Sequence, residues 1–351
     1  MIADVPRSRS HSVRLRWPSE HTYTPAWWVP GAHLQTLWGK LARRPPVVST
    51  RSERWPTPDH DEIEIRRLDR GIHTPVTPRL VILHGLEGTI RSHYLRGTLR
   101  QAEMRGWPAD VLIFRGCNGE VNRVRRMYHS GETGDLELVV RRLIENEPTR
   151  PLVLVGFSLG GNVLLKWLGE RVDVMPSQVV AAAAVSVPFD LERGARHIES
   201  GLSRLYTWHF LRTLKAKARR KLDRFPGLFD VAALDRSRTL YDFDDAVTAP
   251  IHGFRDAHDY YTQSSSLQYL RRVPVPTLLL SSFDDPFLPP DVLERVASEA
   301  SDNQHLVCEF HDRGGHVGFV AGKSPVSARY FAEERVLSFL AAQVVARSAA
   351  A

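Results

Sequence analysis

The sequence predicts an α/β fold, built on a mostly parallel, doubly wound sheet of about eight strands, with a helical insertion. Short apolar runs rich in β-branched residues alternate with amphipathic segments from residue 79 onward, a pattern typical of parallel strands joined by helical crossovers. This alternation stops after Pro188 and resumes at Thr277. Because 351 residues are more than one such sheet requires, we expect a single domain that carries an insertion.

Composition divides the chain into four parts. Residues 1–21 mix arginine, serine and proline, and we expect a poorly ordered tail there. Residues 22–58 form an arm that includes Trp27, Trp28 and Trp38 and is too apolar to be free, so we expect it to pack on the core. The core is predicted at residues 59–187 and 274–346, with a strongly basic helical cap at residues 188–273.

The predicted elements follow the alternation in chain order. Strands are expected at residues 63–68, 79–83, 110–114, 152–155, 179–187, 277–282 and 305–310. Helices are expected at residues 91–106, 133–147, 159–170, 290–300 and 326–346. The first strand, beside an acidic turn at residues 59–62, has the alternation of an edge strand. A basic run at residues 211–224 in the cap is interpreted as a solvated helix face.

The most informative stretch is a buried strand, a sharp turn and a helix at residues 151–170. Its turn is a G-x-S-x-G, from Gly156 to Gly160, with Ser158 at the centre. The two glycines lack a Cβ, so strand and helix can approach closely while the serine hydroxyl projects from the turn. The helix N-terminus beneath favours negative charge at that point. We therefore predict Ser158 as a nucleophile.

A second turn matches this chemistry. The strand at residues 79–83 leads directly into His84-Gly85-Leu86-Glu87-Gly88, an H-G-x-x-G. Serine hydrolases of this architecture place half of their oxyanion hole at such a turn, where glycines keep side chains away from a backbone N–H. We predict the N–H groups of Leu86 and Leu159 as the two oxyanion donors.

A serine hydroxyl needs a histidine to accept its proton and a carboxylate to orient that histidine. Later strand ends supply both, and we favour Asp285 and His316, which follow Ser158 in the order nucleophile, acid, histidine. Asp284 and His311 remain alternatives for the acid and the base. His84, His93 and His129 are interpreted as structural or pocket-lining.

The sequence predicts neither a metal nor an organic cofactor. Fifteen histidines are present, but none forms H-E-x-x-H or a comparable ligand spacing, and no glycine-rich loop has the G-K-[ST] ending that binds phosphate. The two cysteines are too few for a disulfide framework. Cys308 is expected in the core, and Cys117, in a polar loop, is the better candidate of the two for a reactive thiol.

Charge and hydropathy set the expected surroundings. No run of about 18 apolar residues is present, and residues 1–20 lack the apolar region of a secretory signal, so we expect a cytoplasmic protein. A net charge of +7 allows weak association with a membrane surface. Basic residues with little aromatic interleaving do not predict nucleic-acid binding.

Eight motifs carry a resemblance to a known family over most of residues 22–340. They are HLQT (His33–Thr36), HGLEG (His84–Gly88), RSHY (Arg91–Tyr94), FRGCNGE (Phe114–Glu120), YHSGETGDL (Tyr128–Leu136), GFSLGGNVLLKWLGE (Gly156–Glu170), DDPFLP (Asp284–Pro289) and GGHVGF (Gly314–Phe319). With these motifs the chain resembles the YheT-like branch of the α/β-hydrolase superfamily, which is related to eukaryotic abhydrolase-domain lipid esterases. It departs from the family pattern at the acidic turn, where a glycine is expected, and in its unusually basic cap.

The resemblance implies an α/β-hydrolase fold, a Ser158, Asp285 and His316 triad, and ester hydrolysis through an acyl-enzyme. The predicted substrate is a small-molecule ester with a short to medium acyl chain, or a lipid-like ester. An acyltransferase would use the same acyl-enzyme with an alcohol in place of water, so the sequence leaves that alternative open. A third hypothesis is a non-catalytic protein that holds an anionic lipid or a partner with its basic cap.

Overall fold

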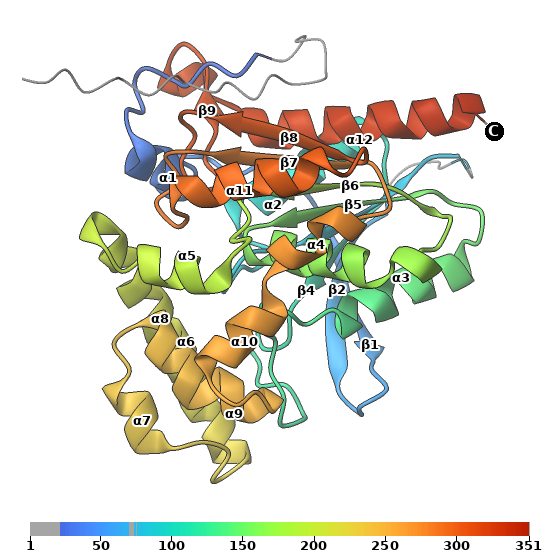
Figure 1. The fold of residues 1–351 in the computed structure, drawn as a ribbon. Helices are drawn as coiled ribbons and strands as arrows, with labels where there is room; N and C mark the ends of the chain where they lie inside the picture. Colours follow the sequence, from blue (N-terminus) through green and yellow to red (C-terminus); the bar gives the residue numbers. More distant parts are fainter. Residues whose placement is uncertain (1–21, 70–73, 75, 351) are drawn as a thin grey trace, which may run out of the picture.

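One eight-stranded sheet organises the computed structural model, which describes residues 22–69, 74 and 76–350 (Figure 1). Its strands are β1 (Arg51–Pro56), β2 (Glu62–Leu68), β3 (Arg79–Leu83), β4 (Ala109–Ile113), β5 (Leu152–Phe157), β6 (Val179–Val185), β7 (Thr277–Ser282) and β8 (Leu306–His311). They lie in the order β1-β2-β4-β3-β5-β6-β7-β8. The strands from β4 to β8 in this order run parallel, whereas β1 and β2 are antiparallel to their neighbours. The predicted fold class, a mostly parallel sheet of about eight strands, is confirmed.

Helices cover both faces of this sheet. On one face α2 (His93–Met104) packs against α12 (Phe331–Ala350), which also contacts β6. On the other face lie α3 (Gly134–Asn146), α4 (Leu159–Glu170) and α11 (Pro290–Ser301), as Figure 1 shows. Within α4, Val163, Leu164, Trp167 and Leu168 recur at helical spacing and are fully buried. None of the helices in the described part of the chain is both long and apolar enough to span a bilayer.

Two predicted elements differ from the structure. The sequence predicts the strand at residues 63–68 at the sheet edge, but β1 pairs outside it, with Trp55 opposite Ile63. Only Trp55 of β1 is buried, so the strand lacks the apolar alternation that would reveal it. The last helix begins at Phe331 instead of residue 326, because Pro325–Ser327 forms a 3₁₀ turn and β10 (Arg329–Tyr330) pairs with β9 (Val320–Ala321).

The N-terminal arm lies against β9, which belongs to the small two-stranded sheet with β10. Its helix α1 (Ala32–Leu41) follows an extended segment in which the N–H of Ala26 donates to the carbonyl of Val320 (2.9 Å). Trp28 and Trp38 pack edge to face with ring centroids 4.8 Å apart, whereas Trp27 is 79% exposed. The predicted tail at residues 1–21 lies outside the described residues, and the proposed domain boundaries stay predictions.

Residues between β6 and β7 form a layer of helices beside the sheet, here called the cap (Figure 1). They are α5 (Leu191–His197), α6 (Arg204–Arg224), α7 (Val231–Arg236), α8 (Leu240–Phe243), α9 (Ala249–His252) and α10 (Ala257–Ser264), with a π-helical segment at Asp244–Thr248. The interpretation of residues 211–224 as a solvated face is wrong for two lysines. Lys217 points inward, and Lys221 is fully buried, where desolvation lowers its pKa to about 8. Their ammonium groups bind acceptors in the core, which local sequence does not show.

A buried ionic cluster fixes the acidic turn against the loop after β4. The guanidinium of Arg115 contacts Asp59 and Asp61 at 2.9 Å and Asp135 at 2.7 Å. Burial by itself would raise the pKa of Asp59, but hydrogen bonds from Arg115 and other groups outweigh it and hold that pKa below its usual range. His60, within the acidic turn where the family pattern predicts a glycine, has a left-handed backbone with φ 64°.

Candidate active site

Ser158 occupies the sharp turn between β5 and α4. Its backbone is strained, with φ 51° and ψ −121°, and its N–H donates to the carbonyl of Val185 (2.8 Å). A Cβ on Gly156 would lie 2.4 Å from the carbonyl oxygen of Gly160, and one on Gly160 would lie 2.5 Å from that of His84. Side chains at either glycine would therefore push the strand and helix apart. The turn holds the serine at the sheet's carboxyl edge.

The loop after β3, His84–Gly88, runs directly beside this serine. A Cβ on Gly85 would lie 3.2 Å from the Cβ of Ser158. The fully buried His84 fixes the loop, since its Nδ1 lies 2.7 Å from the carbonyl of Gly85 and its Nε2 accepts the N–H of Phe114 (3.1 Å). Burial lowers the pKa of His84 to about 4, so the imidazole is neutral. His84 is structural, as its position before the glycines suggests.

The backbone N–H groups of this loop differ in their acceptors. Three are occupied: Gly85 donates to the Tyr94 hydroxyl (2.9 Å), Glu87 to the Tyr128 hydroxyl (3.1 Å) and Gly88 to the Gly85 carbonyl (2.9 Å). Within the described residues, the N–H of Leu86 has no acceptor. The N–H of Leu159 is the first of α4, where no intrahelical acceptor exists. Leu86 and Leu159 both line the cavity that contains Ser158.

Asp285 and His316 come together from the loops after β7 and β8. Nδ1 of His316 lies 2.9 Å from Oδ2 and 3.1 Å from Oδ1 of Asp285. The N–H of Phe287 also donates to this carboxylate, at 2.8 Å. The Phe287 ring stacks on the imidazole with centroids 4.0 Å apart. These contacts fix the imidazole plane and leave Nε2 as the nitrogen that is not directed at the carboxylate.

The two alternative residues have other partners. Asp284 accepts the N–H of Gly315 at 2.8 Å and so shapes the histidine loop instead of contacting the imidazole. His311 lies 3.2 Å from Glu309 and packs among aromatic rings, outside the residues that line the cavity. The geometry therefore favours Asp285 and His316 as the interacting pair.

Side chains from distant parts of the sequence hold the loop that carries His316 in place. The N–H of His316 donates to Oγ1 of Thr36 (2.9 Å), and that of Val317 to Oγ of Ser186 (2.9 Å). A Cβ on Gly315 would lie 2.5 Å from the carbonyl of Ala32, so the loop rests directly on α1. The sequence predicts no role for Thr36 or Ser186; for Thr36, its place at the end of the HLQT motif is the signal that could reveal one.

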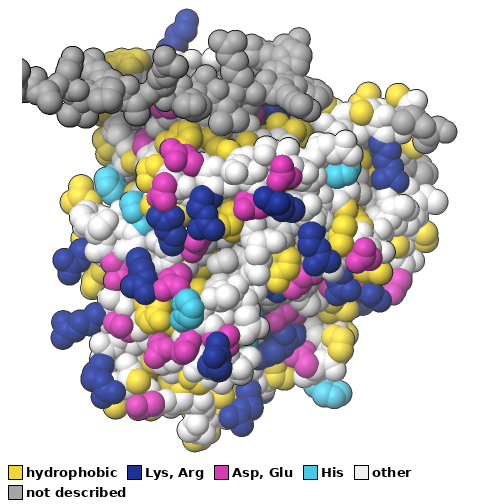
Figure 2. Space-filling view, in the orientation of Figure 1, with side chains coloured by type: hydrophobic (Ala, Val, Ile, Leu, Met, Phe, Trp, Pro, Cys, Tyr) yellow, Lys and Arg dark blue, Asp and Glu magenta, His cyan; other side chains and the backbone are white. Residues whose placement is uncertain are grey.

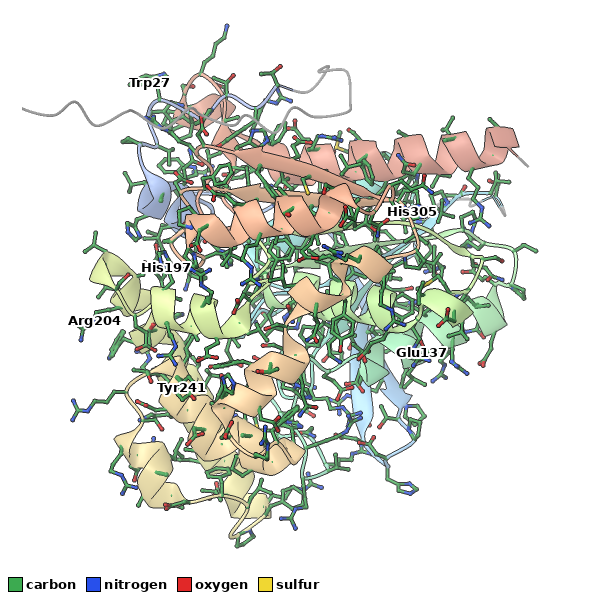
Figure 3. The ribbon with its side chains drawn as sticks, in the orientation of Figure 1. Trp27, Glu137, His197, Arg204, Tyr241 and His305 are labelled. Atoms are coloured by element: carbon green, nitrogen blue, oxygen red, sulfur yellow. The ribbon has the colours of Figure 1, made fainter. Side chains whose placement is uncertain are left out.

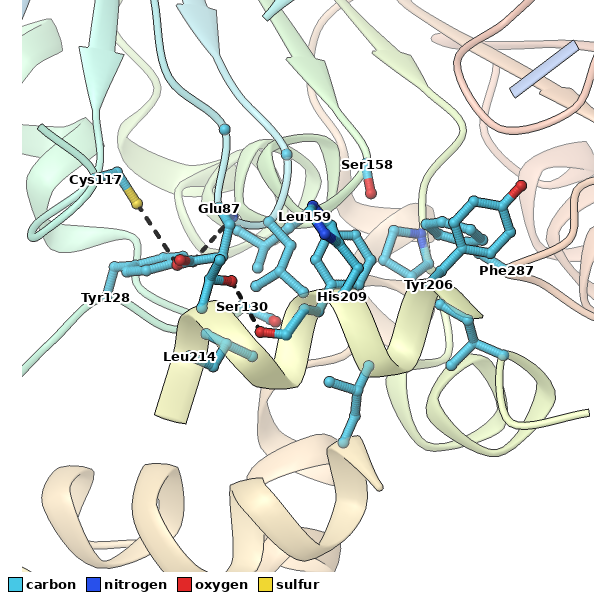
Figure 4. Close-up of a pocket in the computed structure, with 18 of the residues that line it drawn as sticks. Glu87, Cys117, Tyr128, Ser130, Ser158, Leu159, Tyr206, His209, Leu214 and Phe287 are labelled. Carbon is cyan, nitrogen blue, oxygen red and sulfur yellow. Dashed lines mark hydrogen bonds between the residues drawn. The ribbon is translucent and has the colours of Figure 1, made fainter. Parts of the chain in front are cut away.

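A cavity of about 890 Å³ contains Ser158 and His316 and extends under the cap. Figure 4 shows Ser158 above α6, with Glu87, Tyr128 and Cys117 toward one side and Tyr206 and Phe287 toward the other. Its lining is largely apolar. The cap contributes Leu191, Ile198, Leu214, Leu240, Phe243, Val247 and Ile251. Such a cavity can hold a hydrocarbon chain beside the serine.

One wall of the cavity carries a polar cluster. Nζ of Lys217 lies 2.5 Å from Oε1 of Glu87 and 3.5 Å from Sγ of Cys117, and the Tyr128 hydroxyl donates to Glu87 (2.6 Å). Cys117, which the sequence favours as the more reactive of the two cysteines, is buried, and burial raises the pKa of its thiol to about 11; burial raises the pKa of Cys308 to about 12. The pair of charges ties α6 of the cap to the loop that carries Leu86.

A second polar group lines the cavity within the cap. Asp244 accepts hydrogen bonds from Thr248 (2.5 Å) and Tyr261 (2.6 Å), and burial raises its pKa to about 6. The rings of His129 and His252 lie 4.4 Å apart, and burial lowers their pKa values to about 3 and about 2. Both imidazoles are therefore neutral. Among the described residues, no group of three or more His, Cys, Asp or Glu side chains is placed to hold a metal ion.

Comparisons with known proteins agree with this fold. A family model described as alpha/beta hydrolase fold matches residues 78–321. The "Putative esterase YheT" of Escherichia coli (strain K12) is 39% identical over 90% of this chain and 92% of its own. "Phospholipase ABHD3" of Mus musculus is 29% identical, over 88% of this chain and 76% of its own. "Monoacylglycerol lipase" of Saccharomyces cerevisiae is 31% identical, over 73% and 57%.

The chain is also similar to solved structures at low sequence identity. An esterase of Pyrococcus furiosus superimposes with a TM-score of 0.55 and 17% identity, covering 84% of this chain and 91% of that one. A puromycin-hydrolyzing peptidase of Mycobacterium tuberculosis gives a TM-score of 0.52 and 18% identity, over 87% and 41%. At this identity the structural similarity concerns the fold alone.

Proposed function

The chain belongs to the alpha/beta hydrolase fold family, in its YheT-like branch, and we propose that it is a serine hydrolase of carboxylic esters. Ser158 is the nucleophile, His316 its base and Asp285 the acid that orients His316. One observation carries this proposal: His316 lies 2.9 Å from Asp285 and lines the same cavity as a serine held in a strained turn.

Each group has a defined step in the proposed reaction. The hydroxyl of Ser158 attacks the ester carbonyl while Nε2 of His316 takes its proton. The negative oxygen of the tetrahedral intermediate accepts hydrogen bonds from the N–H groups of Leu86 and Leu159. His316 then gives the proton to the leaving alcohol, and an acyl-enzyme remains. Water, deprotonated by the same imidazole, releases the acid and restores the serine.

The cavity supports a substrate with a short to medium acyl chain or a lipid-like ester. Its volume of about 890 Å³ and the apolar side chains of the cap suit a hydrocarbon chain. The names of three relatives, an esterase, a phospholipase and a monoacylglycerol lipase, agree with this substrate class. Since these three relatives are named as hydrolases, water is the acceptor that we propose.

The proposal is tested with a series of p-nitrophenyl esters of increasing chain length and with monoacylglycerol. We expect turnover that depends on Ser158, so that Ser158→Ala abolishes it while the thermal unfolding of the protein is unchanged. Products are analysed with and without added alcohol, and we expect free acid as the sole product. Turnover by Ser158→Ala equal to wild type would contradict the assignment of the nucleophile, and a new ester formed with the alcohol would identify a transferase.

A further inference from the structure

Two helices at the rim of the cavity expose large apolar side chains to solvent. On α1, Leu34 is 50% and Leu41 is 75% exposed. On α6, Leu205 is 67% and Trp208 is 63% exposed, and Leu202 just before α6 is 65% exposed. We call these five residues the rim patch. Exposed groups of this kind mark interaction sites more often than isolated apolar residues do.

Side-chain contacts place the two helices next to each other across the cavity mouth. Nδ1 of His33 on α1 lies 3.2 Å from the Tyr206 hydroxyl on α6, and Nζ of Lys40 lies 3.1 Å from Nε2 of His209. Lys40, Tyr206 and His209 also line the cavity. The rim patch residues do not line the cavity themselves, but four of them are sequence neighbours of these contact residues, so the patch lies beside the part of the cavity wall that α1 and α6 form.

Folding of the cap does not account for this apolar surface. Leu205, Trp208 and Arg212 recur at helical spacing on the outward face of α6, and all three are exposed. The inward face is formed by other positions, Thr207, Leu211, Leu214 and Ala218, which are buried. The helix is therefore apolar both where it packs and where it meets solvent, and only the first is needed for its stability.

The two sequence segments that carry the rim patch contain basic residues but no acidic ones. Residues 22–52, which include α1, contain no aspartate or glutamate. Residues 200–222, which include most of α6, contain seven lysines and arginines, of which Lys217 and Lys221 point inward, and again no acid. Lys40, Arg44, Arg204 and Arg212 are exposed, and Arg212 lies over the Trp208 ring at 5.3 Å. Figure 2 shows basic side chains interspersed with acidic ones along the margin where Figure 1 places α5, and Figure 3 shows Arg204 projecting outward there.

We propose that the rim patch docks the protein on an anionic phospholipid bilayer, so that the cavity faces the lipid. The benefit of this orientation for catalysis rests on the proposed lipid-ester activity. Leucine and tryptophan side chains enter the interfacial region of a bilayer, where tryptophan is favoured. Exposed lysine and arginine side chains beside them attract anionic headgroups. A second copy of the chain is the poorer occupant, because two such patches would bring like charges together.

The first test measures co-sedimentation of the full chain with vesicles of phosphatidylcholine alone and of phosphatidylcholine mixed equally with phosphatidylglycerol. We expect binding to the anionic vesicles that weakens as salt is added. Leu205→Ser/Trp208→Ser is expected to lose this binding. The control Val174→Ser/Val345→Ser changes two valines of similar exposure (65% and 68%) on other elements, and is expected to bind as wild type.

The second test removes charge. Arg204→Gln/Arg212→Gln is expected to weaken anionic vesicle binding about 25-fold, since each basic residue near the surface contributes about fivefold. Its control is Arg141→Gln/Arg347→Gln, on α3 and α12. All four double variants are expected to cleave a water-soluble ester such as p-nitrophenyl butyrate at the wild-type rate.

The outcomes separate this inference from the proposed function. If no variant and no wild-type sample cleaves any ester, the proposed function fails while the vesicle comparison still tests docking. Equal binding to neutral and anionic vesicles, or wild-type binding by Leu205→Ser/Trp208→Ser, would overturn the docking surface. A dimer in solution that this variant dissociates would identify a second copy as the occupant and would overturn it as well.

Discussion

Replacing the proposed acid, Asp285→Asn, changes one atom of the carboxylate that faces His316. The native carboxylate presents two oxygens, 2.9 Å and 3.1 Å from Nδ1, and so holds the proton on that nitrogen. An amide in the same place presents one oxygen and one NH₂ group. With the NH₂ toward the ring, Nδ1 becomes an acceptor and the proton moves to Nε2, which then cannot take a proton from Ser158.

We expect a loss of about 10⁴-fold in kcat, or about 5 kcal/mol of transition-state stabilisation. The assay is steady-state hydrolysis of a short-chain p-nitrophenyl ester, with KM expected to change little. The matched variant is Asp284→Asn. In the native structure the N–H of Gly315 donates to Asp284 at 2.8 Å, and the amide oxygen of the variant can still accept it. We therefore expect kcat to fall by less than about tenfold. A large loss in Asp284→Asn together with wild-type kcat in Asp285→Asn would refute the assignment of the acid.

Three further changes test the supporting contacts. Thr36→Val removes the acceptor of the His316 N–H, and we expect kcat to fall about tenfold at unchanged KM, with recovery in Thr36→Ser. Lys217→Met leaves the Glu87 carboxylate without its counter-charge. Because the Lys217 and Glu87 side chains are each only 13% exposed, we expect the free energy of unfolding to fall by about 3–5 kcal/mol. Burial raises the pKa of Asp244 from 3.8 to about 6, so the folded protein binds the carboxyl proton more tightly than the unfolded chain does. The free energy of unfolding therefore falls as the pH rises from about 4 to about 6. Asp244→Asn avoids that loss, and we expect it to be more stable than wild type above pH 6 by at most about 3 kcal/mol.

Each of these predictions has its own control. A parallel fall in kcat and rise in KM in Thr36→Val would indicate a general distortion instead of a misplaced histidine. Adding Glu87→Gln to Lys217→Met is expected to restore most of the lost stability in urea unfolding, and no recovery would mean that the ion pair is not the cause. For Asp244→Asn, the difference in Tm from wild type must grow from pH 4 to pH 7; a constant difference would exclude titration of this carboxyl.

The fold and the position of the nucleophile turn could be predicted because local residue types determine them. Parallel strands buried on both faces give short apolar runs, and the bounds of β3 and β7 match the predicted ranges. A Cβ on Gly156 or Gly160 would lie 2.4 Å or 2.5 Å from a backbone oxygen, so glycine is required at both positions and marks the turn in the sequence itself. The roles of Ser158, Asp285 and His316 stay predictions, although the structure brings the last two within hydrogen-bond distance.

The supporting contacts could not be predicted because they join distant segments. Thr36 and His316 are 280 residues apart, and Lys217 and Glu87 are 130 apart, so no local periodicity links them. Charge patterning placed Lys217 on a solvated face, since an isolated basic helix gives no sign of a carboxylate on another element. Similarly, Cys117 lies in a polar loop but is covered by Tyr128 and the cap, which the loop sequence does not show.

The most direct test of the proposed mechanism is covalent labelling of the purified protein with a fluorophosphonate, followed by mass spectrometry of the labelled peptide. Fluorophosphonates react with a serine hydroxyl only when a base activates it. We predict a single label on Ser158 that is absent in folded His316→Ala. Labelling of another serine, or equal labelling of Ser158 with and without His316, would contradict the proposed active site.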